Sequence, residues 1–214
     1  MTTPFTTEQF FGVFVAYNAA IWPAQIGAYV LGLVAIAGLW RRRPKLVLAI
    51  LALMWLWNAI GYHYLFFSSI NPGAKLFAGL FALQGLLLAL CPLASANLSF
   101  FVARDLRTAA GLTFIAYATA IYPALGWWAG HGFMAGPTFG VAPCPTTIFT
   151  IGILLLARGR WVVWLSVVPI LWSIVGLAAA LQLRMLEDFA LPIAALLLLI
   201  VLARPQSILK EQSA

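Results

Sequence analysis

Six side chains in this sequence could bind a metal ion, carry a proton or attack a substrate: Glu8, His63, His131, Cys144, Glu187 and Asp188. Imidazole, thiolate and carboxylate groups are ligands that zinc and copper take in proteins. The sequence has no close-spaced pair such as HxxxH or CxxC, so a metal site at His63, His131 and Cys144 requires a fold that brings separate segments together. Two alternatives stay open. Haem or a pigment could bind at His63 or His131, or both histidines could bond only to the backbone or to the acids.

Cys144 is the candidate nucleophile, because it directly precedes Pro145. Proline is favoured in the first turn of a helix, and the start of a helix can lower the pKa of a thiol and make it reactive. His131 is then the candidate base. The alternative is a small residue that packs at a helix start without any reaction.

Polar side chains within apolar stretches form a second candidate site, for a substrate: Asn58, Gln84, Ser173, Trp57 and Trp172. Polar groups are costly in lipid and often mark a substrate pathway. Asn58 and Ser173 share the motif LW[N/S]xxG at 56–61 and 171–176. We expect a pocket near the middle of the membrane, and the alternative is plain hydrogen bonding between helices.

The composition requires a membrane to position these residues. Of 214 residues, 64% are hydrophobic and 8% are charged, which is more apolar surface than a water-soluble core of this size could bury. A crossing needs about 20 mostly apolar residues. The sequence therefore predicts an all-α, polytopic transmembrane helix bundle with spans near 21–40, 46–67, 76–101, 106–128, 141–157, 161–182 and 189–203.

The basic residues predict the orientation of the seven spans. Ten of the twelve Lys and Arg residues follow spans one, three, five and seven, and only Lys75 and Arg184 lie on the opposite side. Because short basic loops stay in the cytoplasm, we expect an outer N-terminus and a cytoplasmic C-terminus in a bacterial inner membrane. The six reactive side chains then form an outer-face polar cluster. The net charge of +7 is explained by this rule and implies no nucleic-acid partner.

The predicted membrane domain, 21–203, has a flanking segment on each side. Residues 1–20 form an outer-face amphipathic segment whose helix begins at Thr6 or Thr7, ahead of Glu8 and Gln9. It either lies on the surface until Pro23 redirects the chain, or it is the start of one long, kinked helix. Residues 204–214 form a cytoplasmic tail. No acidic residue falls inside a predicted span, which disfavours a carboxylate proton relay.

The shared LW[N/S]xxG motif favours an internal repeat. Trp22-Pro23 and Cys144-Pro145 also occupy matching positions before spans one and five. Spans one to three and five to seven then form two parallel halves joined by span four. This three-plus-one-plus-three plan is loosely similar to that of SWEET-type sugar transporters, in plan and not in sequence.

Several motifs on the outer side carry a family resemblance: TTEQFF at 6–11, YNAAIWP at 17–23, YHYLFFSSINP at 62–72, GHGF at 130–133 and PTFGVAPCPTTIFTIG at 137–152. Together they resemble a family of small bacterial integral membrane proteins of unknown function. The resemblance implies a bacterial inner-membrane protein and no activity. The glycine- and proline-rich run GHGFMAGPTFGVAPCP predicts an ordered or re-entrant loop that closes the outer side.

Three functions remain as expectations. The first is a small-solute or ion transporter with a midplane pocket and an outer-face gate. The second is an accessory subunit of a membrane complex that holds a cofactor, pigment or lipid. The third is a membrane enzyme with an outer-face metal or thiol, which the sequence favours least. The expected partners are the lipid bilayer, a small-molecule or ion cargo, and further copies or membrane-complex subunits.

Overall fold

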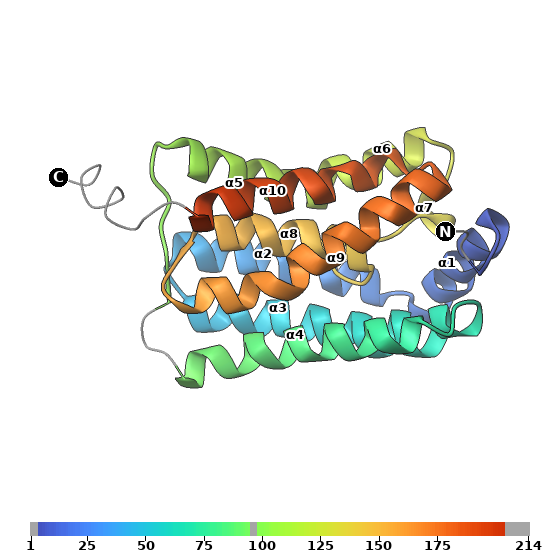
Figure 1. The fold of residues 1–214 in the computed structure, drawn as a ribbon, viewed down its shortest axis with the longest axis horizontal. Helices are drawn as coiled ribbons and strands as arrows, with labels where there is room; N and C mark the ends of the chain where they lie inside the picture. The colour runs from blue at the N-terminus through green and yellow to red at the C-terminus, as the bar shows by residue number, and fades with distance from the viewer. Residues whose placement is uncertain (1–3, 95–97, 204–214) are drawn as a thin grey trace.

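A computed structural model describes residues 4–94 and 98–203 as a bundle of helices (Figure 1). Its first half contains α1 (Thr7–Ile21), α2 (Ala24–Trp40), α3 (Pro44–Trp57), the π-helix η1 (Asn58–Phe66), the 3-10 helix η2 (Phe67–Ser69), α4 (Ala74–Ala94) and β1 (Ser99–Phe100). Its second half contains α5 (Leu106–Ala116), the π-helix η3 (Tyr117–Ile121), α6 (Tyr122–Trp128), α7 (Gly132–Ala135), α8 (Pro143–Leu155), β2 (Ala157–Arg158), α9 (Trp161–Leu183), the 3-10 helix η4 (Leu186–Phe189) and α10 (Ala190–Ala203).

Five helical segments in the described residues are long and apolar enough to cross a membrane: Pro44–Ser69, Ala74–Pro92, Leu106–Trp128, Trp161–Leu183 and Leu186–Ala203. The count rises to six if α1 and α2, which meet at a bend of 83°, are taken as one broken span. Large apolar side chains such as Leu106 and Leu76 are exposed on the outside of the bundle. The expected mostly helical fold is confirmed, whereas the count of seven spans and the two halves are not.

Helix α8 lies where the fifth span was predicted, but it has only 13 residues. At about 1.5 Å per residue, it covers about 20 Å of the roughly 30 Å hydrocarbon layer. Every residue of α8 except Cys144 is buried, and its neighbours are α3, α5, α9 and α10. Helix α8 is therefore the centre of the bundle, and its apolar surface contacts protein.

The packing of α8 depends on small and hydroxyl-bearing residues. Gly111 of α5 and Gly152 of α8 pack so closely that a Cβ atom on either would lie 2.8 Å from the carbonyl oxygen of the other. The indole Nε1 of Trp55 donates a 2.9 Å hydrogen bond to Oγ1 of Thr150. The Thr146 hydroxyl donates to the carbonyl of Ala142, one turn earlier in the chain. No threonine hydroxyl of α8 is thus left without a partner in the core, as burial requires.

The two ends of the bundle differ in charge. The basic end, where α2, α4, α8 and α10 finish in Figure 1, carries eight described basic residues: Arg41, Arg42, Arg43, Lys45, Arg104, Arg107, Arg158 and Arg160. There, β1 pairs with β2, and the guanidinium of Arg107 donates to the carbonyls of Leu155 and Ala157. The opposite end, here called the α1 end, carries α1, α7 and η4. Arg204 and Lys210 of the predicted tail lie outside the described residues.

The sequence-based helix start at Thr6 is confirmed. Its side chain accepts from the backbone of Gln9, and the Gln9 side chain accepts in turn from the Thr6 backbone, which forms a capping box. Beyond the bend at Pro23, Nε2 of Gln25 donates to the Asn18 carbonyl at 3.0 Å and so ties α2 to α1. Helix α1 is therefore fixed across the α1 end at a steep angle to α2.

Candidate functional site

Two cavities lie at the α1 end of the bundle. The large cavity has a volume of about 750 Å³ and lies between the α1–α2 bend, α6 and the segment 132–138. Its wall is mostly apolar, with a few groups that can form hydrogen bonds: Asn18, Gln25, Tyr29, Tyr122 and Thr138. Such a wall suits a small ligand with one or two polar groups.

The small cavity has a volume of about 190 Å³ and is lined by aromatic rings from several elements. The rings are those of Phe5 just before α1, Phe10 and Phe14 of α1, Tyr62 of η1, Phe67 of η2, Phe77 of α4 and Trp172 of α9. Residues of different chemistry line the same wall, namely Cys144, Asp188, Asn71 and Gln182.

A hydrogen bond joins the walls of the two cavities. The hydroxyl of Tyr122, which lines the large cavity, donates to Oδ1 of Asp188, which lines the small one, at 2.6 Å. Pro137 lines both cavities. Tyr122 and Asp188 are 1% and 2% exposed, so this bond lies in a low-dielectric setting where charge-assisted bonds are strong.

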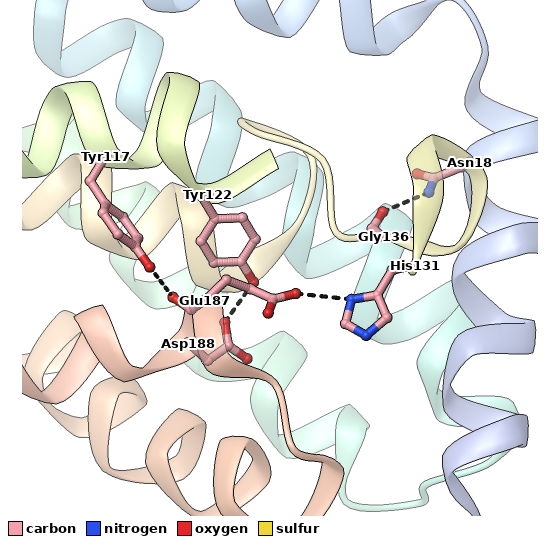
Figure 2. Close-up of polar contacts among 7 residues, drawn as sticks. All are labelled: Asn18, Tyr117, Tyr122, His131, Gly136, Glu187 and Asp188. Carbon is pink, nitrogen blue, oxygen red and sulfur yellow. Dashed lines mark hydrogen bonds and ion pairs between the residues drawn. The ribbon is translucent and has the colours of Figure 1, made fainter. Parts of the chain in front are cut away.

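Glu187 turns the other way from Asp188, towards the loop after α6 (Figure 2). Its Oε1 lies 3.1 Å from Nδ1 of His131, and its backbone carbonyl accepts from the hydroxyl of Tyr117 at 2.8 Å. Its Oε2 has no hydrogen-bond partner among the described residues. The two neighbouring acidic side chains therefore contact different parts of the protein, and only Asp188 lines the small cavity.

The outer-face polar cluster predicted from sequence is only partly assembled. His131, Glu187, Asp188 and Cys144 gather at the α1 end, with Cys144 beside Asp188. Glu8 is exposed in the first turn of α1 and lines neither cavity. The expectation that no acid lies inside a span is wrong, since Glu187 and Asp188 are buried within the candidate span Leu186–Ala203.

The loop after α6 is ordered by α1. Nδ2 of Asn18 donates to the carbonyls of Met134 and Gly136 at 2.8 and 2.9 Å, the latter drawn in Figure 2. The hydroxyl of Tyr17 donates to the carbonyl of Val141 at 2.6 Å. Because both donors come from α1, the position of this loop, and with it the wall of the large cavity, depends on how α1 is docked.

His63 is enclosed by aromatic rings. Its ring centroid lies 4.5 Å from that of Phe81 and 5.1 Å from that of Trp172, with Tyr62, Phe67 and Phe77 around it. Neither ring nitrogen has a hydrogen-bond partner in the described part of the chain. His63 lines neither cavity, so a haem or pigment bound to it would have to displace these rings, and the site does not fit such a group.

The predicted metal set is not brought together. His63 lies among aromatic rings, His131 contacts Glu187, and Cys144 lies beside Asp188. Within residues 4–94 and 98–203, no group of three or more His, Cys, Asp and Glu side chains is placed to hold a metal ion. His131 is also paired with Glu187 and not with Cys144, the thiol for which it was the candidate base.

The donor groups of the predicted midplane pocket bond to backbone carbonyls, while Oδ1 of Asn58 and Oε1 of Gln84 have no hydrogen-bond partner among the described residues. Asn58 donates to the carbonyls of Met54 and Gly140, Gln84 donates to that of Leu165, and Ser173 donates to that of Pro169. These three residues line neither cavity.

The two tryptophans of that set have separate roles. Trp57 is 37% exposed and donates to the Tyr17 hydroxyl, whereas Trp172 lines the small cavity. The structure thus moves the candidate site from the middle of the bundle to the α1 end.

Tyr122 and Asn18 are site residues that the sequence reasoning missed. The place of Tyr122 near a predicted span end suggests a membrane-interface aromatic, although it is almost fully buried and bonds to an acid. Asn18 belongs to the YNAAIWP segment, in which its amide has no evident role from sequence. A signal was present, since a side-chain amide beside an apolar helix end usually has a specific partner.

Comparison with protein-family models gives a match over nearly the whole chain. A search of curated proteins and a search of solved structures return no significant match. The family model described as "Family of unknown function (DUF6064)" matches residues 7–212, which is nearly the whole chain. The chain belongs to this family.

Proposed function

We propose that this protein is a small-solute or ion transporter of the bacterial inner membrane, with its α1 end on the periplasmic side. The observation that carries the proposal is the pair of cavities joined by the Tyr122–Asp188 hydrogen bond. A large, mostly apolar cavity whose wall is joined by one side-chain hydrogen bond to that of a smaller cavity is an arrangement suited to capture and onward passage of a solute.

The charge distribution supports the proposed orientation. Eight described basic residues lie at the basic end, against Lys75 and Arg184 elsewhere in the described chain. Short loops rich in Lys and Arg remain in the cytoplasm. The large cavity would then face the periplasm, where a solute first meets the protein.

We also propose seven membrane-crossing segments, with α8 as the fifth. Helix α8 is short, but it is surrounded by other helices. A segment shielded from lipid does not have to match the hydrocarbon thickness, since irregular backbone at membrane depth is tolerated inside protein. The predicted pocket at Asn58, Gln84 and Ser173 is replaced in this proposal by the two cavities.

The test compares two neighbouring positions on α1. Ala19 lines the large cavity and is exposed, whereas Ala20 is exposed and lines neither cavity. Proteoliposomes containing the wild type, Ala19→Trp or Ala20→Trp would be incubated with a bacterial metabolite extract, and the captured solutes would be identified by mass spectrometry. We expect a solute that accumulates with the wild type and Ala20→Trp but not with Ala19→Trp. Equal accumulation in all three, or none above protein-free liposomes, would rule out the proposal.

A further inference from the structure

The small cavity combines aromatic faces with one buried carboxylate. Seven aromatic rings, from Phe5 just before α1 and from α1, η1, η2, α4 and α9, line a volume of about 190 Å³. The face of an aromatic ring carries partial negative charge and attracts a cation that lies within about 6 Å of its centroid. A wall of several rings therefore favours a cation that is not strongly hydrated.

Asp188 is the acidic group in that wall, and it forms no ion pair with a basic side chain in the described part of the chain. Its neighbour Glu187 contacts the His131 ring, whereas Arg184, the closest basic residue to Asp188 in sequence, is exposed. Asp188 instead lies beside two neutral groups, the hydroxyl of Tyr122 and the thiol of Cys144. A buried carboxylate without a counter-charge is unfavourable, so a cation that enters the cavity would be strongly stabilised.

The wall also excludes most inorganic cations. Hard metal ions such as Ca²⁺ take about six to eight oxygen ligands, and Asp188 is the only carboxylate that lines this cavity in the described part of the chain. An organic ammonium ion needs no such shell, because its alkyl groups contact the rings while its charge is offset by the carboxylate. Aromatic cages are the usual recognition device for quaternary ammonium groups.

We propose that the small cavity is a binding site for a small organic ammonium ion, held by Asp188 and the surrounding aromatic rings. The site stands independently of transport, because binding at equilibrium does not require the ion to be the solute that crosses the membrane. Helix α1 supplies Phe10 and Phe14 to the wall, so the ion would also link α1 to α9 and η4.

The first test uses choline and 3,3-dimethylbutan-1-ol, which have the same shape and differ in charge. Calorimetric titration of the purified full chain in detergent should show choline binding at least about tenfold tighter than the neutral analogue, as expected for a charge in an aromatic site. Asp188→Asn should weaken choline binding by about tenfold or more. Glu187→Gln is the matched control and should bind choline as the wild type does, because Glu187 does not line the cavity.

The second test needs no change at Asp188 and so remains informative if that variant does not fold. Cys144 lines the small cavity, and its alkylation by N-ethylmaleimide in the wild type should be slowed by choline but not by the neutral analogue. A cysteine at the exposed position Ala20, introduced as Ala20→Cys, should be alkylated at the same rate with and without choline.

Either of two results would overturn the proposal. The first is equal affinity for choline and the neutral analogue. The second is no measurable choline binding together with an unchanged rate of Cys144 alkylation in the presence of choline. Choline binding in a protein that moves no solute in proteoliposomes would remove the transport function and leave this site in place. Solute transport by a protein that does not bind choline would remove this site and leave the transport function in place.

Discussion

The hydroxyl of Tyr122 and the carboxylate of Asp188 lie 2.6 Å apart, and this hydrogen bond links the wall of a large cavity to the wall of a small one. The two residues come from opposite sides of the wall, since Tyr122 begins α6 and Asp188 lies in η4 before α10. Any movement of α6 relative to α10 would stretch or break this contact. The bond therefore links the relative position of α6 and α10 to the shape of both cavity walls.

Removing the Tyr122 hydroxyl should destabilise the protein. Tyr122→Phe leaves a buried carboxylate without its donor, and we expect a loss of about 1–3 kcal/mol in the free energy of unfolding. Tyr117→Phe is the matched control, because the Tyr117 hydroxyl donates to the neutral backbone carbonyl of Glu187. The loss in the free energy of unfolding for Tyr117→Phe should be smaller, at about 1 kcal/mol. Denaturant titration in detergent micelles measures both. A larger loss for Tyr117→Phe than for Tyr122→Phe would contradict the importance assigned to Asp188.

Replacing His63 with phenylalanine should stabilise the protein. The imidazole is buried among aromatic rings and neither nitrogen has a partner in the described chain, so His63→Phe removes unsatisfied polar atoms and should raise the free energy of unfolding by about 1 kcal/mol or more. Asn58→Leu is the contrasting change, because it removes the side-chain donor to the carbonyls of Met54 and Gly140. It should lower the free energy of unfolding by about 1 kcal/mol. A destabilised His63→Phe would show that the imidazole has a partner from outside the chain.

The contact between α5 and α8 should not tolerate an added methyl group. A Cβ atom at Gly152 would lie 2.8 Å from the Gly111 carbonyl oxygen, so Gly152→Ala should cost about 1–3 kcal/mol through overpacking. A Cβ atom at Gly79 in α4 would meet nothing within 4 Å, and Gly79→Ala should change stability by less than about 1 kcal/mol. Both values come from the same denaturant titration. Equal stability of the two variants would mean that the helices separate easily at this point.

The proposed orientation predicts which end reacts with an impermeant reagent. Phe133 in α7 and Ala103 at the basic end are both exposed, so single cysteines can be placed there, as Phe133→Cys and Ala103→Cys, in a background without Cys91 and Cys144. In spheroplasts, a membrane-impermeant maleimide should label Phe133→Cys and leave Ala103→Cys unlabelled until the membrane is permeabilised. The reverse pattern would invert the orientation.

The local signals in the sequence were reliable where one short segment determines its own structure. Thr6 or Thr7 ahead of Glu8 and Gln9 predicted the helix start, where the structure has Thr6 as the N-cap, and the glycine-rich run after α6 predicted an ordered or re-entrant loop, which Asn18 and Tyr17 hold in place. Such features depend on the conformation of a few neighbouring residues, and their chemistry is visible in the chain itself.

Features that depend on packing could not be predicted in this way. The sequence of α8 is as apolar as that of a lipid-facing helix, and hydropathy does not distinguish burial in protein from burial in lipid. The burial of Asp188 and its bond to Tyr122 arise from residues 66 positions apart. The two LW[N/S]xxG motifs also differ in the structure, because Asn58 begins a π-helix whereas Ser173 lies within α9.

The position of α8 at the centre of the bundle has a consequence for biosynthesis. A segment of 13 residues is too short for the insertion machinery to recognise as a span by its own hydrophobicity. Its neighbours α3 and α5 precede it in the chain, while α9 and α10 follow it. If α8 is the fifth span, as proposed, its enclosure is complete only after α9 and α10 have been made. We then expect that a chain truncated before α9 would not hold α8 stably in the bilayer.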